Sequence, residues 1–231
     1  MKLSSIVPWG RSFAEYRDMF ALSEGDLQGR VLGCGDGPAS FNAEATVAGI
    51  RVVSIDPLYA YTAPEIERRV SEIFETVVSQ TRAQAHRFVW DRFSDADSLG
   101  LARLNAMQRF LLDYKMGKKA GRYVEASLPD LPFADGSFDL ALCSHLLFLY
   151  SDHLSLDEHI AAVRELLRVA REVRIFPLLS LSGEPSPYII PLCKLLSNEG
   201  YAIERQVVPY EFMRGGNTML KSSRREAGPA C

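Results

Sequence analysis

Hydrophobic and polar positions recur along this chain with two different periods. Short apolar runs that stop at Gly, Asp or Pro predict strands, and stretches with apolar residues every three or four positions predict helices. Strands are predicted at 29–33, 50–55, 122–125, 138–143, 172–176, 202–208 and 217–222, and helices at 38–48, 155–170 and 187–197. Alternating strands and helices favour a mainly parallel sheet covered on both faces. The last two strands, with no helix between them, favour an antiparallel edge.

Two Ser-x-x-Glu patterns predict helix starts. In such a capping box the serine hydroxyl and the glutamate carboxylate bond reciprocally to backbone amides that have no partner within the helix. Ser155 and Glu158 form one pattern, and Ser12 and Glu15 form the other. Residues 1–28 are therefore expected to form a helical segment that precedes the sheet.

The stretch 57–121 is much longer than a usual crossover between strands. Its apolar spacing predicts one helix from Pro64 through Val77, a second from Leu101 to Gly117, and a third over 83–92. We expect these helices to pack on one another and on the N-terminal helix, as an insertion that roofs one end of the sheet. The N-terminal contacts are expected at Phe13, Tyr16 and Phe20. The whole chain, 1–231, is interpreted as one domain with this insertion.

Composition narrows the class of protein. Hydrophobic residues make up 47% and charged residues 24%, and the net charge is −3, so the chain is expected to be globular, without a basic field for nucleic acid. Apolar runs are too short for a membrane span, and residues 1–11 lack the pattern of a signal peptide. Four scattered cysteines, with no Cys-x-x-Cys, predict neither a zinc site nor disulfides, and favour a reducing cytoplasm. The cysteines are Cys34, Cys143, Cys193 and Cys231.

Gly33-Cys-Gly-Asp-Gly37 lies between a predicted strand and helix, at the carboxyl edge where open parallel sheets bind ligands. The glycines allow either a tight structural turn or a close approach of the backbone to a ligand. Pro38 stands where a dinucleotide fingerprint has its third glycine, which disfavours a bound pyrophosphate. Asp56 ends the next strand, where a carboxylate can accept both hydroxyl hydrogens of a ribose. Its alternative role is a turn or cap aspartate before Pro57.

These motifs resemble those of the Rossmann-like, class I S-adenosylmethionine-dependent methyltransferases. Val31–Gly37 is similar to their first motif and Val52–Asp56 to their second. Leu131–His145 is similar to the L-P-F-x-D-x-S-F-D run of the small-molecule branch that includes quinone and sterol methyltransferases. The resemblance covers residues 29–56 and 122–222. It implies a doubly wound, mainly parallel seven-stranded α/β sheet, with the insertion after the second strand.

The resemblance implies S-adenosylmethionine as cofactor, with S-adenosylhomocysteine as product, and methyl transfer to a small molecule by in-line displacement. Asp56 would hold the ribose, and His145, after the fourth strand, is the candidate base. Arg11 would meet the cofactor carboxylate, although a solvated surface arginine is the simpler interpretation. Tyr150, Asp152 and His153 are interpreted as surface of the substrate loop. The remaining cofactor-binding residues implied are Gly33, Cys34, Gly35, Gly37, Pro57, Leu58, Ser127 and Leu128.

Two positions depart from the family pattern. Val31 and Ser127 stand where acidic residues are usual, and a serine loses a charge-assisted hydrogen bond to the cofactor. These departures keep an alternative open: a non-catalytic, cofactor-binding scaffold that binds a protein partner through the insertion. An RNA-modifying enzyme has weaker support, because the basic residues of the insertion are interleaved with acidic ones. No metal site is expected, since His153 and His159 do not share a helix face.

Overall fold

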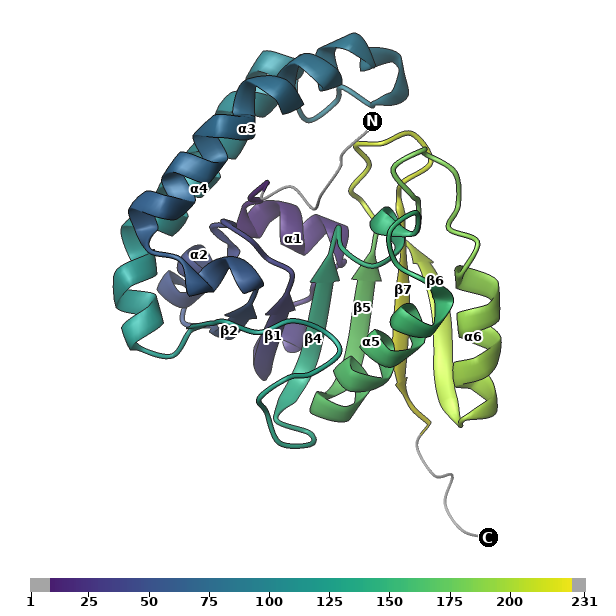
Figure 1. Ribbon diagram of the computed structural model, residues 1–231. Helices are drawn as coiled ribbons and strands as arrows, with labels where there is room; N and C mark the ends of the chain where they lie inside the picture. Colours follow the sequence, from purple (N-terminus) through teal and green to yellow (C-terminus); the bar gives the residue numbers. More distant parts are fainter. Residues whose placement is uncertain (1–8, 226–231) are drawn as a thin grey trace, which may run out of the picture.

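Seven strands form one sheet in the order β3-β2-β1-β4-β5-β7-β6 (Figure 1). The computed structural model describes residues 9–225, so Cys231 and the first eight residues lie outside the described part. Strands β1 to β5 run parallel, and β7 runs antiparallel between β5 and β6, which confirms the predicted antiparallel edge. The strands are β1 Arg30–Cys34, β2 Arg51–Ile55, β3 Tyr123–Val124, β4 Phe138–Ser144, β5 Ala170–Phe176, β6 Tyr201–Val207 and β7 Thr218–Arg224.

Helices cover both faces of the sheet. Helices α5 and α6 lie on one face and α1 and α2 on the other (Figure 1). Both predicted capping boxes are present, at the starts of α1 and α5. The bounds are α1 Phe13–Met19, α2 Phe41–Val47, α5 Leu156–Val169 and α6 Ile189–Asn198.

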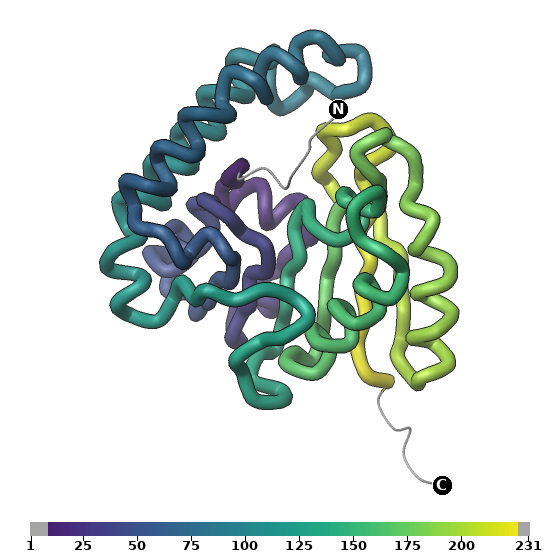
Figure 2. The backbone as a smooth tube through the Cα atoms, viewed as in Figure 1, coloured from purple at the N-terminus to yellow at the C-terminus, as the bar shows by residue number. Residues whose placement is uncertain are grey.

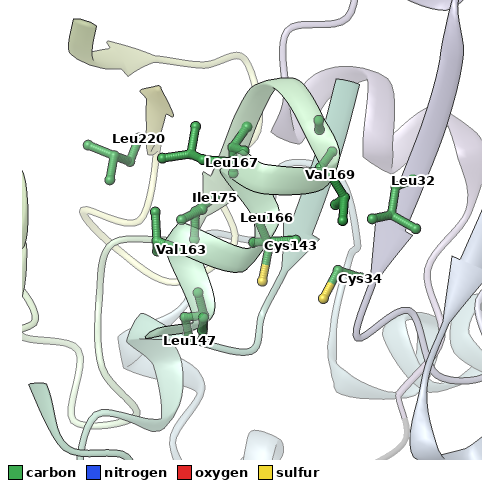
Figure 3. Packing of buried hydrophobic residues seen from close by; sticks show 14 of the residues in the cluster. Leu32, Cys34, Cys143, Leu147, Val163, Leu166, Leu167, Val169, Ile175 and Leu220 are labelled. Carbon is green, nitrogen blue, oxygen red and sulfur yellow. The ribbon is translucent and has the colours of Figure 1, made fainter. Parts of the chain in front are cut away.

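Successive residues of β1 point to opposite faces, which divides the core into two layers. Val31 packs with the cluster under α1 and α2, whereas Leu32 packs with the cluster under α5. Figure 3 shows the second cluster, in which Leu166 and Leu167 of α5 lie over the sheet and Cys34 lies beside Cys143. Cys34 and Cys143 are register partners on β1 and β4. Both strands are thus buried on both faces, as parallel strands usually are.

The insertion forms a helical hairpin of α3 Ala63–Ala83 and α4 Ala96–Lys119. Figure 2 shows the two helices side by side, reaching from the β2–β3 side over the carboxyl ends of the strands. Helix α4 continues past Gly117, where its end was predicted. Gly117 lies against Tyr123 and leaves no room for a side chain. The chain turns after the helix at Gly121, which has a φ of 73°. No helix in the described residues has the length and apolar character needed to cross a membrane.

One expectation for the insertion is wrong, and a second is met through other residues than those expected. Residues 83–92 do not form a third α-helix, because only 85–87 coil, as a 3₁₀ turn, before Phe88 forms an extended bridge with Met213. The 3₁₀ turn holds its own backbone, and beyond it the β6–β7 loop bonds to the backbone of Arg87 and Val89. The N-terminal helix meets the insertion through the ion pair of Glu15 and Arg103, whereas the core cluster that holds Phe13, Tyr16 and Phe20 contains no residue of the insertion. These three aromatic residues pack on α2 and the sheet, where the Tyr16 and Phe41 rings stack at 4.1 Å.

Candidate functional site

A cavity of about 890 Å³ lies at the carboxyl edge of the sheet, between the strand loops and the α3–α4 hairpin. Nine of the ten predicted site residues line it, although they come from four separate segments of the chain. They are Cys34, Gly35, Gly37, Asp56, Pro57, Leu58, Ser127, Leu128 and His145. Gly33 is not among the residues that line the cavity; it lies in β1, below the loop, and its contact with a ligand stays a prediction.

The loop after β1 needs glycine at the positions that face the cavity. Gly35 and Gly37 have φ values of 68° and 53°, a region that other residues enter only with strain. A side chain at Gly35 would also approach Leu146 to 2.8 Å. The Gly35 amide donates to the carbonyl of Ile55 at 3.0 Å, which ties the loop to the end of β2.

Asp36, between these glycines, is a site residue that the sequence reasoning missed. Its buried carboxylate accepts from the Tyr16 hydroxyl at 2.7 Å and from the Ser54 hydroxyl at 2.5 Å. Burial raises the pKa of Asp36 to about 7, although both hydrogen bonds oppose the rise. Gly33 makes room for this carboxylate, because a Cβ there would lie 1.9 Å from it. The position of Asp36 inside the glycine motif was the feature of the sequence that could have indicated its role.

Asp56 is fixed by two backbone amides. Oδ2 accepts from Gly37 at 2.9 Å and Oδ1 accepts from Leu58 at 2.8 Å, at the start of the 3₁₀ turn Pro57–Ala60. Burial raises the pKa of Asp56, while these two amide bonds oppose the rise. The carboxylate lines the cavity with accepting capacity left on both oxygens. The cap role that the sequence left open is therefore present, in a side chain that also faces the cavity.

The loop after β3 supplies the other wall at this end. The Asp130 amide donates to the Ser127 carbonyl at 3.1 Å and closes a turn. This turn uses the backbone of Ser127 and not its hydroxyl, and the residue is exposed. Leu128 packs against the α5 cluster. Across the cavity, the Arg69 guanidinium lies 3.9 Å from the centre of the Tyr61 ring. This end of the cavity thus combines apolar walls with a few polar groups.

A buried ion pair joins the N-terminal segment to the insertion. Arg103 of α4 donates to Glu15 Oε2 at 2.6 Å, and the Tyr210 hydroxyl donates to Glu15 Oε1 at 3.0 Å. Burial alone would raise the pKa of Glu15, but the charge and hydrogen bond of Arg103 hold it at about 2. Sequence reasoning found Glu15 only as a capping residue, and nothing local in the sequence marks Arg103 or Tyr210.

Arg11 lines the cavity beside this pair, so it is not the solvated surface arginine expected from the sequence. It donates to the carbonyl of Trp9 at 3.1 Å, and its Nε is buried with no hydrogen-bond partner among the described residues. Burial, followed by repulsion from Arg103, lowers the pKa of Arg11. No carboxylate in the described part of the chain forms an ion pair with it.

His145 lies where predicted, directly after β4. Its ring lines the cavity, contacts Phe176 edge-on, and has Nδ1 2.9 Å from the Ser144 hydroxyl. Its backbone has a φ of 52°, and its amide donates to the Phe176 carbonyl at 2.6 Å. Burial, then the charges of Arg11 and Arg103, lower its pKa well below the usual value. The imidazole is therefore neutral near pH 7.

The far end of the cavity is closed by a contact that we call the aromatic clasp, formed by residues 86–90 and 212–214. The Phe88 and Phe212 rings stack at 4.6 Å, and Trp90 packs edge-on against Phe212. The Val89 amide donates to the Phe212 carbonyl at 2.7 Å, and the Arg214 amide to the Arg87 carbonyl at 3.0 Å. The clasp fastens the insertion to the β6–β7 loop, so the insertion forms a wall of the cavity.

Other candidates are resolved by burial. Tyr150 is buried and lines the cavity, which corrects its assignment to the surface, whereas Asp152 and His153 are exposed as expected. His159 is buried, with its ring nitrogens 2.7 Å from the Ser155 carbonyl and 3.0 Å from the Leu147 carbonyl. Within residues 9–225, no cluster of three His, Cys, Asp or Glu side chains could hold a metal ion.

Comparison with known proteins identifies relatives along most of the chain. The family described as "Methyltransferase domain" matches residues 95–173. An uncharacterized protein of Methanocaldococcus jannaschii, MJ0045, is 34% identical over 221 residues, which cover 95% of this chain and 97% of that protein.

Solved structures are similar at lower identity. The magnesium protoporphyrin IX methyltransferase of Synechocystis PCC 6803 with bound SAM is 14% identical, with 92% of this chain and 91% of that chain covered and a TM-score of 0.45. A SAM-dependent methyltransferase of Methanosarcina mazei is 13% identical, with 86% and 93% covered and a TM-score of 0.47. The chain is related along most of its length to the Methanocaldococcus protein. Its matched domain and its seven-stranded sheet assign it to the class I methyltransferase family.

Proposed function

We propose that this methyltransferase binds S-adenosylmethionine at the carboxyl edge of the sheet and transfers its methyl group to a small molecule. The observation that carries the proposal is the pairing of Asp56 with the glycine loop. A carboxylate held by the Gly37 and Leu58 amides faces a cavity that the backbone enters without side chains at Gly35 and Gly37. When bound, S-adenosylmethionine supplies an activated methyl group on a sulfonium.

Each wall of the cavity suits one part of that molecule. The free lone pairs of Asp56 accept the two ribose hydroxyls, and Pro57 and Leu58 contact one face of the adenine. Ser127 and the Leu128 amide bond to the adenine edge. Cys34, Gly35 and Gly37 pass beneath the methionine part, and Gly33 leaves the space that the Asp36 carboxylate occupies.

Arg11 binds the carboxylate of the cofactor. Arg11 is half-buried, its Nε has no hydrogen-bond partner, and no carboxylate among the described residues pairs with it. An anion that enters the cavity would compensate this charge. Arg103 does not need this anion, since Glu15 already neutralises it. The fit of the site to the cofactor is thus supported at both of its ends.

His145 accepts the proton that the acceptor loses. When Nδ1–H donates to the Ser144 hydroxyl, Nε2 carries a free lone pair, and the lowered pKa keeps it unprotonated near pH 7. A positioned base of this kind adds about a hundredfold or more to a transfer reaction. The rest of the rate enhancement comes from the alignment of the two reactants and from the exclusion of water by the insertion.

A small molecule suits the site better than a polymer does. The cavity size is typical of small-molecule sites, about 300–1,000 Å³. The insertion and the aromatic clasp cover the end beyond His145. On the cysteine pattern of the sequence we assign the reaction to the cytoplasm.

Calorimetric titration tests the cofactor site with two ligands. S-adenosylhomocysteine carries the amino-acid carboxylate, whereas 5′-methylthioadenosine lacks it. Arg11→Gln is expected to weaken binding of the first by about tenfold and leave the second unchanged, because a hydrogen bond to a charged group is lost. Arg17→Gln, an exposed arginine on α1, is the matched control. No heat with either ligand on the unaltered protein would refute the proposal.

A further inference from the structure

The glycine loop and the end of β2 bring two carboxyl groups to one end of the cavity, and neither has a cation as its partner. Asp36 and Asp56 both line the cavity, and no ion pair within residues 9–225 includes either of them. Only 6% of Asp36 is exposed, so little water screens its charge from the cavity. Two neighbouring buried anions without a cation are costly, so the ligand-free protein favours a proton on one of the two.

The partners of the two carboxyl groups differ in kind. Asp56 accepts from two backbone amides, which only donate and therefore fit the ionised form. Asp36 accepts from the hydroxyls of Tyr16 and Ser54, and a hydroxyl can donate to a carboxylate or accept from a protonated carboxyl group. The Tyr16 hydroxyl also has the Ser144 hydroxyl as a hydrogen-bond partner, to which it can turn. Asp36 can thus gain or lose a proton without leaving a polar group unpaired.

The other titratable groups next to Asp36 carry no charge near pH 7. Burial raises the pKa of Tyr16 and Tyr59 well above the usual range. A hydrogen bond with Cys143, followed by burial, raises the pKa of the Cys34 thiol in the same way. These three groups therefore neither release a proton when a ligand binds nor compensate the charge of Asp36.

Among the described residues, the charge that shifts the pKa of Asp36 is that of Asp56. Burial raises the pKa of Asp36 to about 7, the two hydroxyl hydrogen bonds oppose this rise, and the charge of Asp56 adds to it. Arg11 lowers the pKa of Tyr16 but is not among the groups that shift Asp36. His145 is neutral near pH 7. A cation that enters the cavity therefore meets a carboxyl group whose charge has no compensation yet.

The cofactor and its product differ by one methyl group and one positive charge. S-adenosylmethionine and S-adenosylhomocysteine both carry an ammonium and a carboxylate, and only the first carries a sulfonium as well. In the function proposed above, Gly35 and Gly37, on either side of Asp36, pass beneath the methionine part that holds the sulfur. A positive charge there favours the ionised form of a nearby carboxyl group, whereas a neutral sulfur does not.

We propose that Asp36 distinguishes the cofactor from its product: its carboxylate is stabilised by the sulfonium of S-adenosylmethionine and not by the neutral sulfur of S-adenosylhomocysteine. The inference rests on the function proposed above. When the cofactor binds, the O–H bond of Asp36 breaks, its electron pair stays on the carboxylate oxygen, and the proton passes to the solvent. After the methyl group has left, Asp36 takes a proton back from the solvent. The preference of the site for the cofactor over the product therefore grows as the pH rises.

Calorimetric titration in two buffers with different ionisation enthalpies counts the protons that binding releases. Because Asp36 is half-ionised at about pH 7, each S-adenosylmethionine should release about half a proton there, and S-adenosylhomocysteine should release none from this group. Between about pH 6 and about pH 8, the affinity for S-adenosylmethionine should rise about tenfold, while that for S-adenosylhomocysteine stays level. The α-amino groups of both ligands also titrate, at about pH 8, so each value is compared with a variant that lacks the Asp36 carboxyl group.

Asp36→Asn is that variant, because an amide keeps the size and the hydrogen bonds of the side chain but releases no proton. The proton release and the rise in affinity should both disappear in it. Asp97→Asn, at an exposed aspartate of α4, is the matched control and should retain both. Ser54→Ala is a second variant: it removes a hydrogen bond that lowers the pKa of Asp36, so the proton release should move to higher pH. A merely structural role of Ser54 would weaken both ligands equally at every pH.

Equal proton release with the two ligands would mean that their shared ammonium acts on Asp36, and the proposal would be overturned. Release that persists in Asp36→Asn would assign it to another group, such as Asp56, and would also overturn the proposal. If both ligands bind and neither releases a proton, the proposed cofactor function stands and this inference falls. If neither ligand binds, the cofactor function itself fails. Should Asp36→Asn not fold, the two ligands on the unaltered protein and on Ser54→Ala still decide.

Discussion

The carboxylate of Asp56 accepts a hydrogen bond from the backbone amide of Gly37 at 2.9 Å. This contact ties the end of β2 to the loop after β1, across the neighbouring strands of the sheet. The other oxygen of Asp56 accepts from the Leu58 amide at 2.8 Å. A single side chain therefore shapes the loop, caps the following turn and faces the cavity, and its removal affects both stability and binding.

Asp56→Ala is expected to weaken S-adenosylhomocysteine binding by about 1.5–3 kcal/mol, the scale of hydrogen bonds to a charged group. Loss of the cap should lower the free energy of unfolding by about 1 kcal/mol. Calorimetric titration and urea unfolding measure the two effects. Asp152→Ala, an exposed aspartate, is the control, and an unchanged dissociation constant for Asp56→Ala would remove this residue from the site.

Gly35→Val is expected to abolish cofactor binding. A β-branched residue is strained at a φ of 68°, and its side chain would collide with Leu146 and enter the cavity. Gly136→Val is the matched control, because Gly136 has a φ of 63° and a Cβ added there would have no atom within 4 Å. Both variants carry the same backbone strain, so the difference between them reports the effect on the cavity. If Gly35→Val binds S-adenosylhomocysteine as tightly as the unaltered protein, the loop is only a structural turn.

The buried carboxyl of Asp36 makes stability depend on pH. Its folded pKa of about 7 lies above the ordinary value of 3.8, so the folded state holds the proton more tightly. The free energy of unfolding should therefore fall as the pH rises from about 4 to about 7, and stay level above that. Asp36→Asn should flatten this slope in urea unfolding series. A slope that is the same in both proteins would show that other groups cause it.

Arg103→Met is expected to lower the free energy of unfolding by about 3–5 kcal/mol, because it leaves the Glu15 carboxylate buried without its cation. Adding Glu15→Met should restore much of the loss, since no unpaired charge then remains. Arg109→Met on the same helix breaks an exposed ion pair with Glu44 and should cost under about 1 kcal/mol. Equal losses for the single and double variants would contradict the explanation by unpaired charge.

The aromatic clasp is expected to respond to the cofactor. The tip of the insertion, residues 83–92, is held by the Val89 and Arg214 amides and by rings packed on Phe212. If the insertion closes over a bound cofactor, amide hydrogen exchange at 83–92 should slow when S-adenosylhomocysteine is present. Equal protection in both states would make the insertion a static wall. Residues 156–169 of α5, in the core, are the internal reference.

Local patterns in the sequence were enough to predict the sheet, the glycine loop and the strand-end carboxylate. Strand and helix periods are local, and so are capping boxes, turn glycines and an aspartate that follows a strand. These features determine where the carboxyl edge of a parallel sheet lies and which residues stand there. Nine of the ten predicted site residues line one cavity, although they are spread from Cys34 to His145. Local pattern indicated the glycine loop and Asp56, and the resemblance to the methyltransferase family implied the others.

The charges at the other end of the cavity, in contrast, depend on tertiary packing. Glu15, Arg103 and Tyr210 lie far apart in the chain, and each by itself is an ordinary cap, helix or loop residue. The same holds for Phe88 and Met213, whose bridge replaced a predicted helix. The packing of the insertion on the rest of the protein determines which of these residues pair. A buried polar group is stable only with a hydrogen-bond partner, and no local pattern in the sequence specifies that partner.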